Sequence, residues 1–505
     1  MGFYCSRTKE RRKEPPDIQA YVFWGAVLFL VILAVLLRVP GIGDYGVRID
    51  EAYQFETAVG YLETGQFKRW DFVKQKVTES YHRAWPYTWL SAQVMKWTGR
   101  RLVAGRYLSL VWGLLLLPVA LGICWSLKLN RLFTVLSLYL VTISTFCITI
   151  SRWFRLYSMF VTCISLGVFG LIMLFREEEG RKSWFILLTL LGFSGSLLTH
   201  PMFTVVVIGS VVLWAILEYG FLQSGQWKNI PVWGYTALLI VSMVMGVVAY
   251  TYLDRLMFEV GSPLDPYPFY IVYYVQENLG YGIGGLVIGL TLYWLYKRRP
   301  GRLVLFIMFV PLLTFVFFTS RFPQVRYLAF LLPVVIPAFM KSAHETVRHM
   351  KSSARTAFTI VLVLVILVVP ARSAQSRLNY IWKGNMGYVA FPRTHDPRYK
   401  LAIEWLTSRI DSDDQVIMCH SFSRTLAEYS ERNFKLIPVD PNERIDRKKL
   451  LKIQDQREHT WLMFARELPN CFYSRTHRYI RAHYRNVKDV PREFHVRLMK
   501  LQQND

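Results

Sequence analysis

The sequence predicts a polytopic α-helical membrane protein, and three properties of the chain lead to this fold class. First, 53% of the 505 residues are hydrophobic and only 19% are charged, whereas soluble proteins carry about 25% charged residues. Second, apolar runs long enough to cross a bilayer recur between Ala20 and Val369. Third, basic residues gather between these runs, as they do in the cytoplasmic loops of membrane proteins. A soluble enzyme, a disordered scaffold and a small secreted disulfide-rich domain are excluded.

About 11 transmembrane helices are expected, because a span needs roughly 20 residues. The stretch from Ser183 to Leu217 carries no Asp, Glu, Lys or Arg and is too long for one crossing, so His200-Pro201 is expected to divide it into two spans. The predicted spans are Ala20–Leu37, Leu108–Leu127, Leu132–Ile150, Leu156–Phe175, Ser183–Leu198, Met202–Leu217, Val232–Leu253, Leu279–Tyr296, Leu303–Thr319, Tyr327–Met340 and Ala357–Val369.

The distribution of Lys and Arg predicts the orientation. The net charge is +25, and the basic N-terminal tail (residues 1–19) is expected to stay cytoplasmic. Ala20–Leu37 lacks a cleavage pattern and is expected to remain as the first span. Counting from there, an odd number of spans places the C-terminus on the extracytoplasmic face. Because the basic residues are assigned to cytoplasmic segments of a membrane protein, nucleic acid is not an expected partner. The predicted cytoplasmic basic segments are Lys128/Arg131, Arg176–Lys182, Lys297–Arg299 and Lys341–Arg355.

Three parts follow: the tail, a membrane module (20–370) whose first outer loop covers about 40–107, and an extracytoplasmic C-terminal region (371–505). In the last part, helix-like and strand-like stretches alternate, which predicts a small C-terminal α/β domain. Cys419 and Cys471 lie in polar sequence there and are a candidate disulfide pair. The predicted elements are helices at Tyr399–Ile410 and Arg424–Glu431 and strands at Val416–Cys419, Phe434–Val439 and Trp461–Phe464.

The first outer loop holds the candidate catalytic residues. Asp50 and Glu51 open a stretch in which Ala52, Phe55 and Val59 fall on one helical face. Such a helix is expected to lie along the membrane surface as an amphipathic juxtamembrane helix. One carboxylate can act as a general base toward an acceptor hydroxyl, while the other positions the acceptor or a cation. The alternative is that Asp50 only caps the helix.

A divalent cation, Mg²⁺ or Mn²⁺, is a candidate cofactor near Asp50 and Glu51. Two adjacent carboxylates nevertheless supply few of the roughly six oxygen ligands that such ions take. Metal dependence is therefore left open by the sequence.

Two pairs of arginines border spans on the predicted outer side. Arg152 and Arg155 lie in S-R-W-F-R-L-Y, and Arg321 and Arg326 lie in S-R-F-P-Q-V-R-Y. Arginine is disfavoured on this side, so a compensating anion is expected, and the guanidinium group binds phosphate in two-point geometry. The alternatives are snorkelling at span ends or ion pairs with the carboxylates of the first outer loop.

His200 lies in the polar break within the long apolar stretch, again on the predicted outer side. It is a candidate substrate ligand. The alternative is that its ring satisfies backbone groups that Pro201 leaves without hydrogen bonds.

A set of motifs, taken in order, resembles a known family. R-I-D-E-A-Y follows the first span, H-R-A-W-P-Y-T-W-L and A-G-R-Y-L-S precede and open the second, and S-R-W-F-R-L-Y-S follows the third. L-L-T-H-P follows the fifth span, and V-R-Y-L-A-F-L-L-P comes late. In this order they resemble integral-membrane glycosyltransferases of the GT-C superfamily, in particular the dolichyl-phosphate-mannose protein mannosyltransferase and aminoarabinose transferase group (glycosyltransferase family 39). The resemblance covers about the first 340 residues.

This resemblance implies an enzyme that moves a sugar from a polyprenyl-phosphate-linked donor to a lipid, glycan or protein acceptor at the extracytoplasmic face. The chain departs from the family at His82-Arg83-Ala84-Trp85-Pro86, where the family often has His-Pro-Pro. Pro86 is therefore the better match, and His82 is a candidate substrate-binding residue. The family's functional positions map onto Asp50 with Glu51 beside it, Arg152, Arg155, Tyr157, Thr199 and His200.

The mechanism expected from these residues is a single displacement with inversion at the anomeric carbon. Asp50 takes the acceptor proton, and Glu51 orients the acceptor or supports Asp50. The arginines neutralise the departing phosphate electrostatically. A transporter or flippase for lipid-linked glycans is the alternative, although the chain shows neither clear repeats nor mid-membrane ionisable residues. A ligand-binding sensor is a third class. The arginines assigned to the phosphate are Arg152, Arg155, Arg321 and Arg326.

Overall fold

The computed structural model describes about three fifths of the chain. Predicted spans Val232–Leu253, Leu279–Tyr296 and Leu303–Thr319 lie outside the described residues apart from Ile307, as do Arg321, Arg326 and the side chains of Cys419 and Cys471. The described residues are 18–43, 49–72, 75–175, 182–215, 307, 330–364, 366–367, 399–411, 413–419, 435–439, 445–455, 459–465, 474–487, 490 and 496–501.

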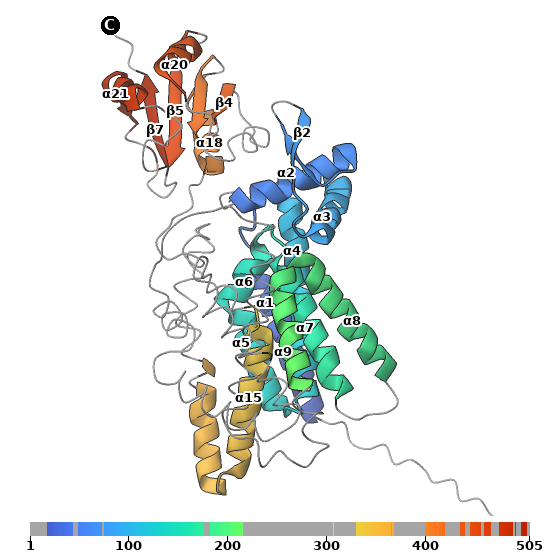
Figure 1. Ribbon diagram of the computed structural model, residues 1–505. Coiled ribbons are helices and arrows are strands. Elements are labelled where there is room, and N and C mark those ends of the chain that lie inside the picture. The colour runs from blue at the N-terminus through green and yellow to red at the C-terminus, as the bar shows by residue number, and fades with distance from the viewer. Residues whose placement is uncertain are drawn as a thin grey trace, which may run out of the picture.

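A bundle of apolar helices forms the body of the molecule (Figure 1). Helices α1 (Ile18–Arg38), α4 (Leu102–Ser126) and α7 (Tyr157–Leu174) are each long and apolar enough to cross a membrane. Helices α5 (Arg131–Ile143) and α6 (Thr145–Arg152) form a pair bent by 52° that passes the same test as one broken span. These helices lie where the first four spans are predicted, and this is a membrane protein.

The remaining described helices of the bundle are shorter. Helix α8 (Lys182–Thr199) ends directly before His200, and α9 (Pro201–Ala215) begins directly after it, so the predicted division at this point is present. Helix α15 (Leu332–His349) continues beyond the predicted end of a span at Met340. In this extension Lys341 and Glu345, one turn apart, form an ion pair of 2.8 Å. The total of 11 spans stays a prediction.

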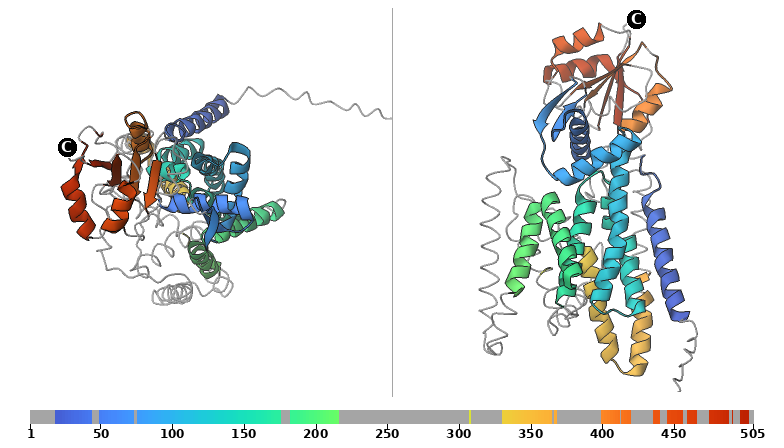
Figure 2. Two further views of the ribbon diagram at one scale, coloured as in Figure 1. Left: turned by 90° about the horizontal axis from the view of Figure 1, so that it is seen from above. Right: turned by 90° about the vertical axis from the view of Figure 1, so that its right-hand side faces the viewer.

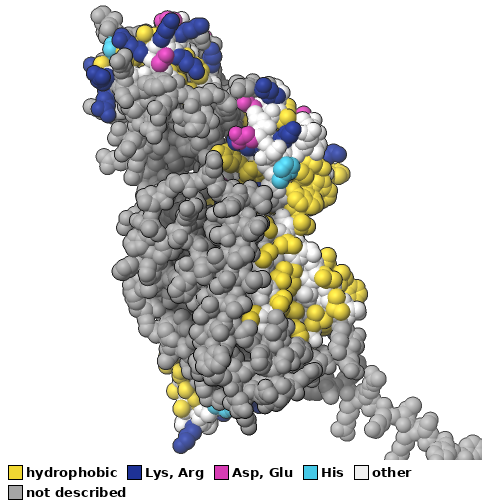
Figure 3. Space-filling model, in the orientation of Figure 1, with side chains coloured by type: hydrophobic (Ala, Val, Ile, Leu, Met, Phe, Trp, Pro, Cys, Tyr) yellow, Lys and Arg dark blue, Asp and Glu magenta, His cyan; other side chains and the backbone are white. Residues whose placement is uncertain are grey.

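Close helix packing explains why small residues recur in the bundle. A Cβ atom at Gly192 on α8 would lie 2.2 Å from the backbone nitrogen of Gly167 on α7, so only glycine allows these two helices to approach so closely. Large apolar side chains on the other side of the bundle point outward, for example Leu28 and Leu36 of α1. Figure 3 shows hydrophobic side chains over the visible flank of the bundle and charged side chains at its two ends, as expected for a lipid-facing surface.

The loop between α1 and α4 folds over one end of the bundle, which we call the Asp50 end. It contains α2 (Ile49–Thr64), a hairpin of β1 (Lys68–Asp71) and β2 (Lys76–Ser80), and α3 (Trp85–Thr98). Figure 2 shows α2 lying across the ends of the vertical helices, with the hairpin projecting from it.

Helix α2 is covered by protein on two sides, and its predicted position along the membrane surface stays a prediction. Phe55 and Val59 are buried in the core of the bundle, whereas Ala52 is buried in a cluster formed by the C-terminal region. Helix α3 instead exposes large apolar side chains, with Trp97 86% exposed, which is typical of a helix at a membrane interface.

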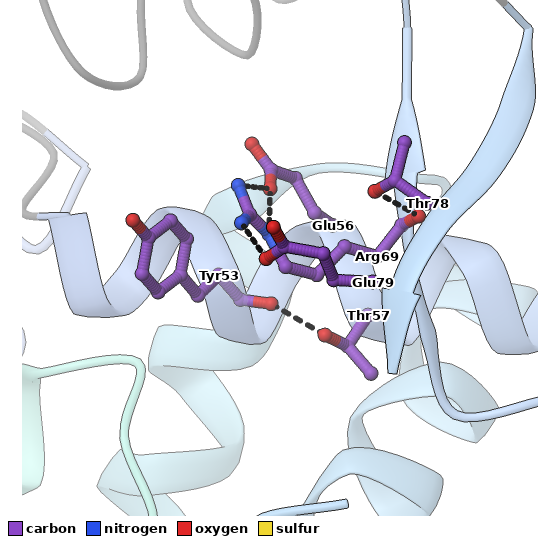
Figure 4. Close-up of polar contacts among 6 residues, drawn as sticks. All are labelled: Tyr53, Glu56, Thr57, Arg69, Thr78 and Glu79. Carbon is purple, nitrogen blue, oxygen red and sulfur yellow. Dashed lines mark hydrogen bonds and ion pairs between the residues drawn. The ribbon is translucent and has the colours of Figure 1, made fainter. Parts of the chain in front are cut away.

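Arg69 ties the hairpin to α2 (Figure 4). Its Nε and Nη2 atoms each lie 2.8 Å from the buried Glu56 carboxylate on α2, and its Nη1 donates to Glu79 on β2 at 3.2 Å. The guanidinium group also lies 3.9 Å from the ring centroid of Tyr53. Burial lowers the pKa of Arg69, but the charge and hydrogen bond of Glu56, aided by Tyr53 and Glu79, raise it above its ordinary value.

The C-terminal region forms a five-stranded sheet with the order β4-β3-β5-β7-β6. Strands β3, β4 and β5 are parallel, and β7 is antiparallel to β5 and β6. Three of these strands and α18 lie where the sequence predicts them, whereas β6, β7, α20 and α21 carry no such prediction. The elements are α18 (Tyr399–Thr407), β3 (Gln415–Cys419), β4 (Lys435–Val439), α20 (Arg447–Gln454), β5 (Thr460–Ala465), α21 (Ser474–His483), β6 (Tyr484–Asn486) and β7 (Val496–Leu501).

This domain sits at the Asp50 end of the bundle (Figures 1 and 2). The face of the sheet that carries α18 shares a buried apolar cluster with α2, in which Ala52 packs with Ala402, Ile403 and Leu406. The opposite face has its own core, formed with α20 and α21 around Leu450. The start of α2 is therefore held between the bundle and the C-terminal domain.

Candidate active site

Asp50 forms an ion pair with Arg155 at the start of α2. Oδ2 of Asp50 lies 2.5 Å from Nη1 of Arg155, and the Asp50 side chain is 39% exposed whereas that of Arg155 is 4% exposed. Asp50 lies inside the first helical turn, and its side chain accepts no backbone hydrogen bond from the described residues. An accessible carboxylate beside a buried cation is therefore present, and the capping interpretation of Asp50 does not apply.

Glu51 has a different environment, because its side chain is completely buried. Its two oxygens accept hydrogen bonds from Nε and Nη2 of Arg106 on α4, at 3.1 and 3.0 Å. Its Oε1 also accepts the backbone N–H of Phe154 at 2.9 Å. Glu51 thus joins α2 to α4 and to the segment between α6 and α7, which fits support of Asp50 better than direct contact with an acceptor.

Residues 152–155 form a tight segment against α4, and Gly105 makes this possible. A Cβ atom at position 105 would lie 2.3 Å from the ring of Phe154, which is fully buried there. The adjacent Arg106 then reaches Glu51, and the Phe154 backbone reaches the same carboxylate. The packing of one aromatic ring on one glycine therefore sets the positions of the charged groups around Asp50.

Arg152 is fully buried at the end of α6. Its Nη1 donates to the carbonyl oxygens of Arg38 at 3.0 Å and Pro40 at 2.6 Å, at the end of α1. Arg152 and Arg155 therefore share one short segment but serve different neighbours. The prediction that both contact a phosphate is not tested by these contacts.

Two tyrosines border the ion pair. The Arg155 guanidinium lies 4.7 Å from the ring centroid of Tyr157, as expected for a cation–π contact. Burial raises the pKa of Tyr81, opposed by the charges of Arg83 and Arg155 and reinforced by that of Asp50. Tyr81 therefore lies in the electrostatic field of the Asp50–Arg155 pair and stays a neutral hydroxyl. Its position in the loop before α3 carries no sequence signal that marks it as a site residue.

His200 and His82 lie in other surroundings. The His200 ring is surrounded by Phe160, Phe203 and Phe330, with ring centroids 5.1 to 6.5 Å away. Phe330 also lies 5.3 Å from the Tyr157 ring, so a chain of aromatic contacts joins His200 to the neighbourhood of Arg155. His82 is exposed, and its ring meets the Phe67 ring edge-on at a centroid distance of 6.4 Å. Among the described residues, these surroundings include neither Asp50 nor Arg155, and the prediction that His82 binds substrate is not tested by them.

Asp50 and Glu51 both direct oxygens to arginines. Glu51 directs both oxygens to Arg106 and Phe154, and Asp50 directs one oxygen to Arg155. No group of three or more His, Cys, Asp or Glu side chains in the described part of the chain is arranged to hold a metal ion. A divalent cation near Asp50 and Glu51 therefore stays a prediction, and no catalytic step is assigned to a metal.

Two arginines at the site are not among the predicted site residues. Arg106 lies in the A-G-R-Y-L-S motif at the start of the second span, and a charged residue at that position is a signal that could have identified it. Arg38, at the end of the first span, carries the same signal. Both side chains are at most 1% exposed.

Comparison with known proteins agrees with the motif order. Residues 80–261 match the family described as dolichyl-phosphate-mannose-protein mannosyltransferase. Among solved structures, the chain is similar to ArnT from Cupriavidus metallidurans in the apo state, with 13% identity and a TM-score of 0.53, covering 95% of this chain and 97% of that one. The chain has the GT-C fold.

A second solved structure with the GT-C fold is also similar. It is the Archaeoglobus fulgidus oligosaccharyltransferase tethered to an acceptor peptide, with 9% identity and a TM-score of 0.52, covering 87% of this chain and 69% of that one. No curated protein matches the chain significantly in sequence. The predicted GT-C resemblance is confirmed, and at these identities it is the fold that is shared.

Proposed function

We propose that this GT-C protein is a glycosyltransferase that moves a sugar from a polyprenyl-phosphate-linked donor to an acceptor at the extracytoplasmic face. Three findings support the proposal: the GT-C fold, the match to a family whose description names a dolichyl-phosphate donor, and the site around Asp50. The observation that carries it is the accessible Asp50 carboxylate paired at 2.5 Å with a buried arginine.

The reaction is a single displacement at the anomeric carbon of the donor. The acceptor oxygen forms a bond to that carbon while the bond from carbon to the phosphate oxygen breaks, and the lipid phosphate leaves with the electron pair. Asp50 accepts the proton of the acceptor hydroxyl, since its exposed face is open to a bound molecule. The carbon is inverted because attack and departure occur on opposite sides.

Arg155 has two roles in this proposal. Its ion pair keeps Asp50 oriented before reaction. Its positive charge, 4% exposed and therefore poorly screened, also stabilises negative charge that develops on the departing phosphate. Glu51 and Arg106 hold the α2 start in place but do not contact substrate, because both are buried.

The proposed face follows from the opposite end of the bundle. The hairpin of α15 and the helix Ser352–Leu364 carries Lys341, Arg348 and Arg355 at that end. Basic residues near span ends favour the cytoplasm, which supports the proposal that the Asp50 end is extracytoplasmic. A lipid, glycan or protein acceptor would approach there, below the C-terminal domain.

The test replaces Asp50 in host cells that lack the endogenous protein. Cells complemented with wild type or with Asp50→Asn are compared by mass spectrometry of their lipid-linked and surface glycans. The variant should transfer sugar about 10²–10⁴ times more slowly, because a general base contributes roughly this factor. Glu79→Gln serves as the matched control, since Glu79 lies in the same loop and its side chain is 80% exposed.

Transfer by Asp50→Asn at the wild-type rate, in membranes with equal protein levels, would reject Asp50 as the base. Identical glycans in cells with and without the wild-type protein would reject the transferase itself. A change in the leaflet distribution of lipid-linked glycans without any new glycan product would favour a flippase instead.

A further inference from the structure

The face of the C-terminal domain that α20 and α21 cover is strongly basic. The two helices pack together, since Leu450 on α20 and Ile480 on α21 are buried in one cluster. The guanidinium group of Arg447 on α20 also lies 5.0 Å from the ring centroid of Tyr479 on α21. We call the exposed cations of these helices the α20–α21 basic face; they are Arg447, Lys448, Lys449, Lys452, Arg478 and Arg481.

Few carboxylates balance this charge. The acidic residues in the described stretches 445–455 and 474–487 are Asp446 and Asp455, and Asp446 caps α20 by accepting the backbone N–H of Lys449 at 2.7 Å. No cation of the basic face forms an ion pair with a carboxylate in the described part of the chain. Like charges one helical turn apart, such as Lys448 and Lys452, destabilise a helix. An external anion would relieve this repulsion.

The basic face is separate from the candidate active site. The side of the sheet that carries α18 packs on α2 at Ala52, whereas α20 and α21 cover the opposite side. Figure 1 shows α20 and α21 at the end of the molecule remote from the bundle, and Figure 3 shows Lys and Arg side chains gathered on this domain. The sheet therefore stands between the basic face and Asp50, and the face is a second binding surface.

The side chains of the face distinguish between classes of partner. Among the described residues, every exposed large hydrophobic side chain lies between Ile18 and Leu367, so none belongs to the C-terminal domain. A membrane-binding surface inserts such side chains, and the centre of a protein interface is rich in aromatic residues and poor in lysine. A flexible polyanion needs neither, because charge holds it.

The local sequence agrees with a polyanion. The run R-K-K-L-L-K from Arg447 to Lys452 is rich in Lys and Arg, as in patches that bind nucleic acid or heparin-like glycans. Cations spread over two helices can contact several charges of one polymer at the same time, which raises the affinity beyond that of a single contact. The face is therefore suited to a chain of repeated anionic groups.

We propose that the α20–α21 basic face binds an acidic polysaccharide. This rests on the proposed function for one point, the extracytoplasmic side of the domain, because nucleic acid, the other polyanion that suits such a patch, belongs to the cytoplasmic side. Binding there would hold the enzyme beside acidic surface glycans while the site at Asp50 stays free for the reaction.

The test measures binding of polygalacturonate, a polysaccharide with one carboxylate per sugar. Full-length protein in phosphatidylcholine nanodiscs is titrated with polygalacturonate, with neutral dextran and, separately, with phosphatidylglycerol vesicles. Polygalacturonate should bind, and its affinity should fall at least about tenfold between roughly 50 and 200 mM salt, because bound polyanions release counterions. Dextran and the vesicles should not bind.

The variant removes three charges from α20, Lys448→Gln with Lys449→Gln and Lys452→Gln. It should bind polygalacturonate about tenfold more weakly, since each exposed pair contributes modestly, and its salt dependence should be roughly halved because half of the six cations are lost. The matched control makes the same charge change at the opposite end of the molecule and should bind like wild type; it is Arg348→Gln with Lys351→Gln and Arg355→Gln, all exposed.

Three results would overturn the proposal. They are equal affinity of the α20 variant and wild type, an equal loss in the control variant, and binding of phosphatidylglycerol vesicles in preference to polygalacturonate. All three substitutions are at exposed positions, so the Tm of the α20 variant should equal that of wild type. If this variant does not fold, Arg478→Gln with Arg481→Gln on α21 makes the same test independently.

Two further measurements separate this proposal from the proposed function. Asp50→Asn should bind polygalacturonate like wild type, so loss of its transfer activity bears on the proposed function alone. Ala482→Cys places a thiol at an exposed position of α21. In intact cells it should react with a membrane-impermeant maleimide above the wild-type level. Reaction only after permeabilisation would place the domain in the cytoplasm and overturn the assignment to a polysaccharide.

Discussion

Four arginines at the Asp50 end differ in what their guanidinium groups contact. Arg155 pairs with the exposed Asp50, and Arg106 pairs with the buried Glu51. Arg152 donates to backbone carbonyls, and Nε and Nη2 of Arg38 have no hydrogen-bond partner among the described residues. Asp50 and Glu51 are adjacent in the sequence but contact different arginines, because neighbouring side chains on a helix point toward different elements.

At the level of single residues, Glu51→Gln should destabilise the protein strongly. Glutamine keeps the shape of the side chain but leaves Arg106 charged, buried and without its counter-charge. Breaking a buried pair in this way costs about 3–5 kcal/mol. Thermal unfolding of purified protein in detergent measures the change.

The comparison for Glu51→Gln is Glu63→Gln. Glu63 pairs with Arg100 at the surface, where the two side chains are 28% and 54% exposed, so its loss should cost less than about 1 kcal/mol. The double variant Glu51→Gln with Arg106→Met should regain part of the stability. Equal Tm values for Glu51→Gln and Glu63→Gln would show that the buried pair does not support α2.

Among the secondary-structure elements, the segment between α6 and α7 is positioned by α4. Phe154 fits against Gly105, and its backbone N–H reaches Glu51. The hairpin is positioned in a similar way, through Arg69 between Glu56 and Glu79. Each of these elements is thus anchored by a polar contact to another element.

Gly105→Ala should disturb the site without touching a charged residue. Its Cβ would meet the Phe154 ring at 2.3 Å and displace residues 152–155. Overpacking of this kind costs about 1–3 kcal/mol, and sugar transfer should fall because Arg155 moves relative to Asp50. Tm and the glycan assay of the proposed function measure the two effects.

Gly122→Ala on the same helix is the matched control. Its Cβ would meet the Phe169 ring edge at 3.1 Å, a contact that a small shift relieves. Alanine also gains about 1 kcal/mol of helix propensity over glycine, so this variant should be near wild type. Transfer by Gly105→Ala at the rate of Gly122→Ala would contradict the role given to Phe154.

Across the whole molecule, the C-terminal domain and the bundle share the start of α2. Ala52 packs with α18 of the domain, whereas Ala58 on the same helix packs with the bundle. The residue next to Glu51 is therefore part of the interface between the two. Movement of the domain would act directly on the turn that carries Asp50.

Ala52→Asp should loosen this interface. A carboxylate introduced among apolar groups at a position that is 0% exposed lacks a partner, which is costly and is relieved when α18 separates from α2. Hydrogen–deuterium exchange should show faster exchange of the amides of residues 402–407 than in wild type. Ala58→Asp, equally buried but in the other cluster, should leave these amides unchanged. Equal exchange of α18 in the two variants would show that Ala52 does not hold the domain.

The membrane class, the positions of the first spans and the break at His200 follow from the amino-acid sequence without any knowledge of contacts. The choice of Asp50 and of the segment from Arg152 to Arg155 as candidate site residues also follows from the sequence alone. Hydrophobic runs and charges are local properties, so their meaning does not depend on the partner against which a residue folds. The order of short motifs likewise indicates the GT-C resemblance, because it requires only the linear arrangement of residues.

The pairing of the charges, in contrast, depends on the fold. Glu51 and Arg106 are 55 residues apart and Asp50 and Arg155 are 105 apart, and no local pattern encodes which carboxylate meets which guanidinium. The same holds for α2, whose apolar face is like that of a surface helix although the C-terminal domain covers its other side. Burial arises from contacts between distant segments, and burial distinguishes the exposed carboxylate of Asp50 from the structural one of Glu51.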